Sequence, residues 1–184
     1  IDGAGGLLLT SDSMNWSFHL NGAGNFDGDV EMREVIVNAN AAGSLGGGQV
    51  IVDANATLNI NAAQSVGDVL IDATRGTVTI AAGSGLVQTG AYSAGGGGFA
   101  PAITLESGVE LNVASIQAEG VTVNAGGQLT LRGASVTVSD VNSLSVASGG
   151  AVDVMTNELR VHYGDDPSVF NDVLQWIDDG EIFS

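Results

Sequence analysis

The sequence has no cysteine and no lysine, and each absence excludes a class of protein. Without cysteine, no disulfide framework can hold the fold together. Only 4 arginines oppose 21 acidic residues, which gives a formal net charge of −17 at pH 7. We therefore expect neither nucleic-acid binding, which needs clustered basic residues, nor binding to an anionic membrane. Cations, basic surfaces and neutral glycans remain as expected partners.

Proline and aromatic residues are also scarce. There are 2 prolines and 5% aromatic residues, whereas hydrophobic residues make up 44% and glycines number 28. This mixture is typical of many short strands joined by tight turns. No apolar run reaches roughly 18 residues, so we predict no membrane insertion. The chain starts at Ile1 without a visible signal peptide, and we interpret it as a mature form or an excised segment of a secreted protein.

One phrase recurs along the chain: apolar-x-apolar, a short polar turn, and apolar-x-apolar again. The copies are VIVDANATLNI from Val50, VLIDATRGTVTI from Val69, ITLESGVELNV from Ile103, VTVNAGGQLTL from Val121 and LSVASGGAVDV from Leu144. Two short strands and a turn, repeated in this way, describe one coil of a solenoid. We therefore predict an all-β fold, a right-handed parallel β-helix with coils of about 18–20 residues and a short C-terminal capping helix.

The alternation within each phrase predicts which side chains point into the core. A slip of one residue would reverse both faces of a strand, so the register is strongly set. The predicted inward residues are Val50, Val52, Leu58, Ile60, Val69, Ile71, Val78, Ile80, Ile103, Leu105, Leu111, Val113, Val121, Val123, Leu129, Leu131, Leu144, Val146, Val152 and Val154.

The repeat also divides the chain. We expect N-terminal strands or a cap at residues 1–34, the solenoid at 35–164, and a helical cap at 165–184. A Gly-rich insert is expected at 81–101, because the step from Val69 to Ile103 is longer than the others.

Both ends carry signals of a cap. Trp16, Phe18 and Phe26 are expected to close the N-terminal end of the core. Pro167 at a first helical position and Gly180 at a stop position predict a helix from about Pro167 to Asp178. The apolar residues predicted to cover the last coil are Val169, Phe170, Val173, Leu174 and Ile177.

Acidic residues form two patterns that are candidate cation sites. Asp27, Asp29 and Glu31 lie among glycines in GAGNFDGDVE. This segment partly resembles the Gly-Asp repeats of Ca²⁺-binding β-rolls. The second set follows the second inward residue of four phrases: Asp53, Asp72, Glu106 and Asn124. The alternative for the second set is structural, since Asp and Asn are favourable turn residues. The first set is a single copy of a motif that binds Ca²⁺ in tandem copies. No cofactor is required, and Ca²⁺ is the one candidate.

Other side chains are candidates for interaction rather than chemistry. Tyr92 and Phe99, at the margins of the expected insert, could stack on a sugar. Asp178 and Asp179 belong to an acidic C-terminal end that divalent ions or arginines could bridge to another copy. His19 and His162 occupy outward strand positions without ligand partners at metal spacing. Neither a nucleophile elbow nor a phosphate-binding loop occurs, so we expect no enzymatic activity.

The coils resemble a known class of secreted protein. GAGNFDGDV and GGGQVIVDANATLNI look like the right-handed β-helix passenger segments of autotransporter-type and adhesin-type proteins. The closing NELRVHYGDDPSVFNDVLQWIDDGEIFS is similar to a terminal module in extracellular β-solenoid proteins of planctomycete-type bacteria, although the Trp-Gly stretch that often follows its helix is missing. The resemblance covers about residues 22–184 and implies surface display, adhesion or fibre building, with no catalytic residues to carry over.

Three functions follow from these patterns. The first is a structural, extracellular β-solenoid, a subunit or segment of a bacterial surface fibre, sheath or adhesin that self-associates into a homo-oligomer or filament. The alternative is a polysaccharide-binding or polysaccharide-lyase β-helix. The third is an ice-binding solenoid, which the outward Thr79, Thr104, Thr122 and Thr130 fit in part.

Overall fold

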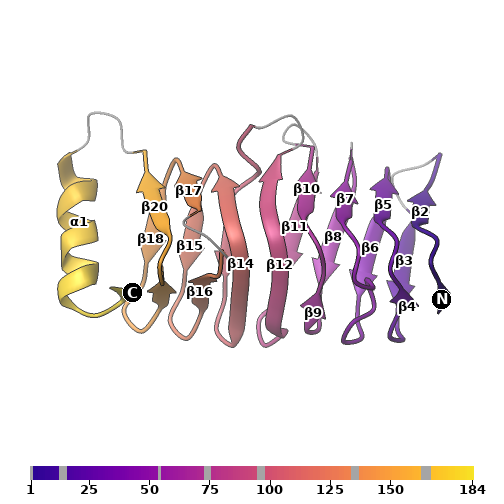
Figure 1. The fold of residues 1–184 in the computed structure, drawn as a ribbon, viewed down its shortest axis with the longest axis horizontal. Coiled ribbons are helices and arrows are strands. Elements are labelled where there is room, and N and C mark those ends of the chain that lie inside the picture. The colour runs from indigo at the N-terminus through magenta and orange to yellow at the C-terminus, as the bar shows by residue number, and fades with distance from the viewer. Residues whose placement is uncertain are drawn as a thin grey trace.

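The protein is a rod of stacked β-coils with a helix at one end (Figure 1). The computed structural model describes residues 2–12, 16–53, 55–72, 76–94, 98–133, 137–162 and 167–184. Within them the chain makes a parallel β-solenoid of about seven turns and one short helix, α1 (Pro167–Asp178). The predicted fold class is confirmed.

Each coil passes through three faces, which we number in chain order. Face 1 contains β2 (Leu7–Thr10), β5 (Val30–Arg33), β7 (Val50–Val52), β10 (Val69–Ile71), β17 (Val138–Val141) and β20 (Glu158–Val161). Face 2 contains β3 (Ser17–Leu20), β6 (Ile36–Ala39), β8 (Thr57–Ile60), β11 (Thr77–Ile80), β13 (Ile103–Leu105), β15 (Val121–Val123) and β18 (Leu144–Val146). Face 3 contains β1 (Asp2–Gly3), β4 (Asn25–Phe26), β9 (Gln64–Ser65), β16 (Gln128–Leu131), β19 (Ala151–Asp153) and β21 (Ile182–Phe183).

Two long strands, β12 (Gly85–Ala94) and β14 (Val109–Ala118), join face 3 to face 1. The first half of β12 pairs with β9, where Val87 lies opposite Gln64. Its second half pairs with β10, where Tyr92 lies opposite Val69. In the same way β14 pairs with β16 through its first half and with β17 through its second half. The chain therefore turns from face 3 to face 1 here without leaving the sheet.

These long strands correct the predicted Gly-rich insert at residues 81–101. Most of that segment is β12, which pairs with both neighbouring coils. The step from Val69 to Ile103 is long because the two phrases begin on different faces. Val69 starts a strand of face 1, whereas Ile103 starts a strand of face 2. The coil length varies, from 18 positions between Ile103 and Val121 to 24 between Tyr92 and Ile116, and the last coil, which contains α1, has 30 between Val152 and Ile182.

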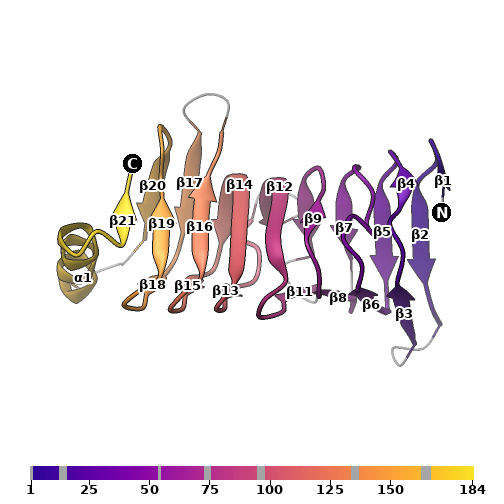
Figure 2. The same ribbon diagram turned by 90° about the horizontal axis from the view of Figure 1, so that it is seen from below.

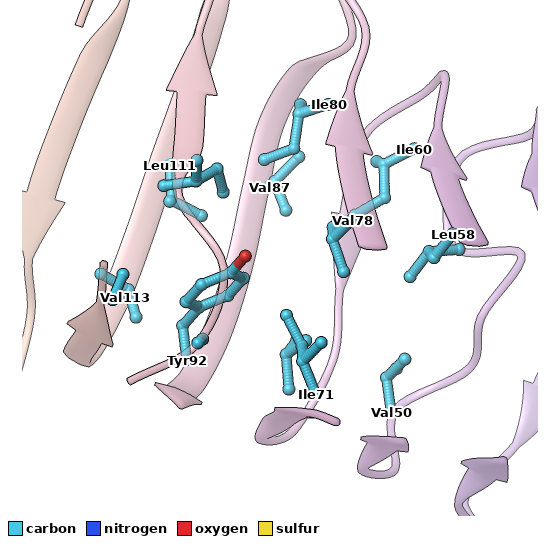
Figure 3. Close-up of a cluster of buried hydrophobic side chains, with 14 of the residues drawn as sticks. Val50, Leu58, Ile60, Ile71, Val78, Ile80, Val87, Tyr92, Leu111 and Val113 are labelled. Atoms are coloured by element: carbon cyan, nitrogen blue, oxygen red, sulfur yellow. The ribbon is translucent and has the colours of Figure 1, made fainter. Parts of the chain in front are cut away.

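The core is a set of aliphatic ladders that run along the rod (Figure 3). All of the predicted inward residues are buried except Val154, which is partly buried. The ladders come from register: Val50 lies opposite Val69, and Leu58 lies opposite Val78. Stacked at about 4.8 Å per strand, these side chains form one hydrophobic cluster along the rod.

The N-terminal segment builds coils rather than a separate plug. β2 pairs with β5 and β3 pairs with β6, so no break in pairing marks residue 34. Phe26 is buried and Phe18 packs partly against the core, but Trp16 is 64% exposed. Nothing in the described residues pairs with the outer edges of β2 and β3.

Helix α1 ends the rod and has the predicted bounds. It stops at Gly180, which has a φ of +73°, and the N–H of Glu181 donates to the carbonyl of Trp176 at 2.8 Å, as in a Schellman cap. The predicted apolar stripe is wrong in part. Trp176 packs against the core, whereas Phe170, Leu174 and Ile177 are 45–54% exposed.

Candidate functional site: an uncharged face

The predicted Ca²⁺ residues Asp27, Asp29 and Glu31 have other roles or stay at the surface. Asp29 accepts a hydrogen bond from the backbone N–H of Gln49 at 3.0 Å. Glu31 forms an ion pair with Arg33. Asp27 is exposed at the end of face 3. Within the described residues no three His, Cys, Asp or Glu side chains gather closely enough to hold a metal. Ca²⁺ binding stays a prediction that no cluster of ligands in the described residues supports.

The Gly-Asp pairs have a structural explanation at the corner between faces 3 and 1. Asp68 accepts from the N–H of Ala91 at 2.7 Å, as Asp29 does from Gln49 two coils earlier. Each carboxylate therefore satisfies a backbone donor of the following coil, which a turn residue commonly does. The Gly-Asp-Val sequence, which occurs at Gly28 and again at Gly67, therefore encodes this corner.

The predicted acidic ladder separates into two pairs. Asp53 and Asp72 follow strands of face 1, where Asp53 pairs with Arg33 at 3.0 Å. Glu106 and Asn124 follow strands of face 2, where the Asn124 amide donates to Glu106 at 2.8 Å. The four side chains cannot form one ladder, because the phrase changes face between the second and third copies.

Tyr92 and Phe99 do not form the predicted sugar-stacking pair. Tyr92 lies in the core and is 2% exposed, so its ring cannot stack on a ligand (Figure 3). Phe99 is half-buried and makes an edge contact with the ring of His162, at 6.0 Å between centroids. His162 also lies 3.0 Å from Asp140, a partner that the sequence did not reveal.

Asp178 and Asp179 lie exposed at the C-terminal end of α1. Asp179 and Asp172 line a shallow depression with Trp176 and Glu181, beside Val146 of face 2. A bridging role for these acids stays a prediction.

Face 2 differs from the other faces because its strands carry no charged residue. The seven strands read SFHL, IVNA, TLNI, TVTI, ITL, VTV and LSV. Face 1 carries Glu31, Arg33, Asp140, Glu158 and Arg160 in its strands. Of the acids in the chain, six lie in described strands, and none of these six lies on face 2. We call face 2 the uncharged face.

Short polar side chains form a row down the centre of the uncharged face. By register the row holds His19, Asn38, Asn59 and Thr79, and then Thr104, Thr122 and Ser145. Figure 2 shows the seven strands in this order along one side of the rod. Three of the threonines considered for ice binding lie in this row, whereas Thr130 lies on face 3 and is 5% exposed.

Hydrogen bonds between coils hold the amides of this face in place. Asn61 donates to Asn40 at 2.8 Å, and Asn40 donates to Asn21 at 2.9 Å. In the adjacent row Asn59 donates to Asn38 at 3.0 Å. Each side-chain amide has two N–H groups and a carbonyl with two lone pairs, so stacking leaves capacity for a ligand. The result is a flat, pre-ordered array of neutral donors and acceptors.

The sequence contains a signal for this array that strand periodicity alone overlooks. HLN at His19, NAN at Asn38 and NIN at Asn59 repeat a polar-x-Asn pair on successive coils. The second polar residue of each pair follows the strand and occupies a turn position. Asn is common at such positions for structural reasons, so the repeat is difficult to distinguish from ordinary turn residues.

Comparisons with known proteins give no family for this chain. No family model, curated protein or solved structure matches it. No helix in the described part of the chain is long and apolar enough to cross a membrane.

Proposed function

We propose that the protein is a structural segment of an extracellular bacterial surface adhesin, and that its uncharged face holds a neutral polysaccharide. The observation that carries this proposal is the absence of Asp, Glu, Lys and Arg from all seven strands of that face. The parallel ladders support the structural part, since stacked coils make a stiff rod. The resemblance of the coils to adhesin passenger segments supports the location.

The charge distribution favours a neutral polymer over an acidic one. A net charge of −17 repels polyanions such as uronate polymers or nucleic acid. Amide and hydroxyl side chains offer hydrogen bonds to sugar hydroxyls without the cost of stripping water from a charge. A row along the rod axis also matches an extended chain better than a compact ligand.

Binding without catalysis fits the same face. General acid–base chemistry needs a titratable group in reach of the substrate. His19 is the one titratable side chain in the strands of this face, and it contacts Asn40 and Ser17 at 3.3 Å. No carboxylate lies in those strands, and Glu106, which follows β13, accepts a hydrogen bond from the Asn124 amide at 2.8 Å rather than from His19.

Affinity electrophoresis tests the proposal. Wild-type protein would run in native gels cast with dextran, β-glucan or galactomannan as neutral polymers, and with alginate as the acidic one. Retardation is expected in at least one neutral gel and not in alginate.

Ser145→Asp places a charge in the central row and should abolish retardation. Ser65→Asp on face 3 adds the same charge elsewhere and should leave it unchanged. Equal effects of the two variants would contradict the proposal.

Self-association is a second function, and helix α1 favours it. Phe170, Leu174 and Ile177 expose an apolar stripe on this helix. Exposed apolar patches commonly mark surfaces that contact another protein.

Sedimentation velocity over a range of concentrations, with and without a chelator, tests assembly. Leu174→Asp should shift the protein toward monomer, whereas Asn171→Asp on the same helix should not. A wild-type protein that stays monomeric throughout would contradict self-association and leave the glycan proposal standing.

A further inference from the structure

The ladder of the uncharged face is interrupted between β11 and β13. Strands β3, β6, β8 and β11 form one sheet, and β13, β15 and β18 form another. Face 1, by contrast, is paired without a break from β2 through β12 and β14 to β20. The two strand edges of face 2 line a slit together with the side chains around them.

The interruption has a cause in the coil that contains β13. The N–H of Ala100 donates to Gln117, and the N–H of Ile103 donates to Gly120, both at 2.9 Å and both in the following coil. Contact with the preceding coil resumes at the next corner, where Gly83 donates to Ser107 at 3.0 Å. This part of the chain is therefore drawn toward the following coil and away from β11.

Backbone groups point into the slit from both sides. In a parallel ladder alternate residues direct their N–H and C=O to opposite neighbours. Thr77 and Ala81 donate to Ala56 and Ile60 of the preceding coil, so the backbone groups of the intervening Val78 and Ile80 point toward β13. Ile103 bonds the following coil, so the groups of Thr104 point back toward β11. None of these groups belongs to a ladder across the slit.

The side chains of the slit add hydroxyls and one carboxylate. Thr77, Thr79 and Thr104 line the slit and are exposed, and Glu106 lines it as well. One Glu106 oxygen accepts the Asn124 amide at 2.8 Å, which fixes the carboxylate and leaves its second oxygen for another donor. The threonine hydroxyls, the Glu106 carboxylate and the backbone groups therefore place both hydrogen-bond donors and acceptors around one opening in the central row.

We infer that this slit is the anchoring subsite of the uncharged face and takes the hydroxyls of one neutral sugar residue. Sugar hydroxyls donate and accept at once, so they can satisfy the backbone groups of Val78, Ile80 and Thr104 as water does. The carboxylate of Glu106 accepts from a sugar hydroxyl, a charge-assisted hydrogen bond stronger than those available elsewhere on the face. The inference rests on the proposed binding of a neutral polysaccharide and names its strongest contact point.

Titration of ¹⁵N-labelled protein with D-glucose, D-galactose and D-mannose tests the subsite directly. At least one sugar should give saturable shifts of the Val78, Ile80 and Thr104 amides. Glu106→Gln should weaken that binding about 10-fold, because it removes a hydrogen bond to a charged group. Thr104→Val should weaken it about 5-fold. Thr122→Val, in the same row where the ladder is intact, should change it less than 2-fold.

The outcomes separate this inference from the proposed function. No saturable shift with any of the three sugars, or equal effects of Thr104→Val and Thr122→Val, overturns the subsite. If Glu106→Gln and Thr104→Val are still retarded in neutral gels as strongly as wild type, the proposed polysaccharide binding is retained and the anchoring subsite is rejected. Melting temperatures matched to wild type establish that each variant is folded.

Discussion

Tyr92 is the residue that fits its surroundings least well. Its ring fills the core beside Val87 and Leu111, but its hydroxyl lies buried without a hydrogen-bond partner (Figure 3). A buried polar group without a partner costs about 1–3 kcal/mol. Tyr92→Phe keeps the ring and removes the hydroxyl, so we expect the free energy of unfolding to rise by about 1 kcal/mol. Urea denaturation at pH 7 measures it, and a decrease would mean that the hydroxyl is satisfied.

The same residue predicts a pH dependence. Burial raises the pKa of the Tyr92 hydroxyl far above its ordinary value of 10. In the unfolded chain the hydroxyl ionises near pH 10, whereas in the folded protein it stays neutral. Stability that is fully present below pH 10 is therefore lost above it, by up to about 1.4 kcal/mol per pH unit. The difference in stability between wild type and Tyr92→Phe should widen between pH 9 and 11, and a constant difference would contradict this.

Gly48 shows why glycine recurs at the corner between faces 3 and 1. A Cβ at Gly48 would lie 2.2 Å from the carbonyl oxygen of Gly28, in the coil below. Gly48→Ala should therefore destabilise the protein by about 3 kcal/mol, at the upper end of overpacking effects. Gly47→Ala next to it meets nothing within 4 Å and should change stability by less than about 0.5 kcal/mol. Similar losses in both variants would contradict a close approach of the coils.

At the scale of elements, helix α1 has two apolar sides with different roles. Trp176 packs against the core, while Phe170 is 54% exposed. Trp176→Ala should lower the free energy of unfolding by about 2 kcal/mol, less than for a fully buried tryptophan. Phe170→Ala should lower it by less than about 0.5 kcal/mol. Thermal and urea unfolding of both variants measures this, and the reverse order would mean that the helix docks through the predicted stripe.

Strand and helix bounds could be predicted because their signals are local. The alternation of Val50 and Val52, or of Leu111 and Val113, identifies the buried side without knowledge of the neighbours. Pro167 and Gly180 mark the helix in the same way. The orientation of α1 about its axis could not be predicted, because Val169 and Val173 can belong to an apolar helix face either with Trp176 or with Phe170. Only the docked position decides between the two sides.

For the whole molecule, the membership of each strand in a face is a non-local property. The phrase from Val50 starts on face 1 and the phrase from Ile103 starts on face 2, although they read alike. The phrase changes face after β12, which turns from face 3 to face 1. The sequence around β12 is rich in glycine and has no periodic pattern that would predict this turn. The uncharged face was hidden for this reason, since its strands come from different halves of the phrase.

The separation of charge among the faces is the central feature of the rod. Every charged residue of the described strands lies on face 1 or face 3, and the net charge of −17 disfavours the approach of polyanions. The uncharged face is the surface on which we propose that a neutral polysaccharide lies across successive coils. Its asparagines are already ordered by hydrogen bonds, which would lower the entropy lost in the proposed binding.

Chemical-shift mapping with neutral oligosaccharides tests this account most directly. Oligosaccharides of dextran, β-glucan and galactomannan would be titrated into ¹⁵N-labelled protein at low and high salt. The account predicts that the shifted amides lie on β6, β8, β11, β13, β15 and β18, with an affinity that does not depend on salt. Shifts centred on β5, β7 and β17 of face 1, or no shifts with any of the three, would contradict it.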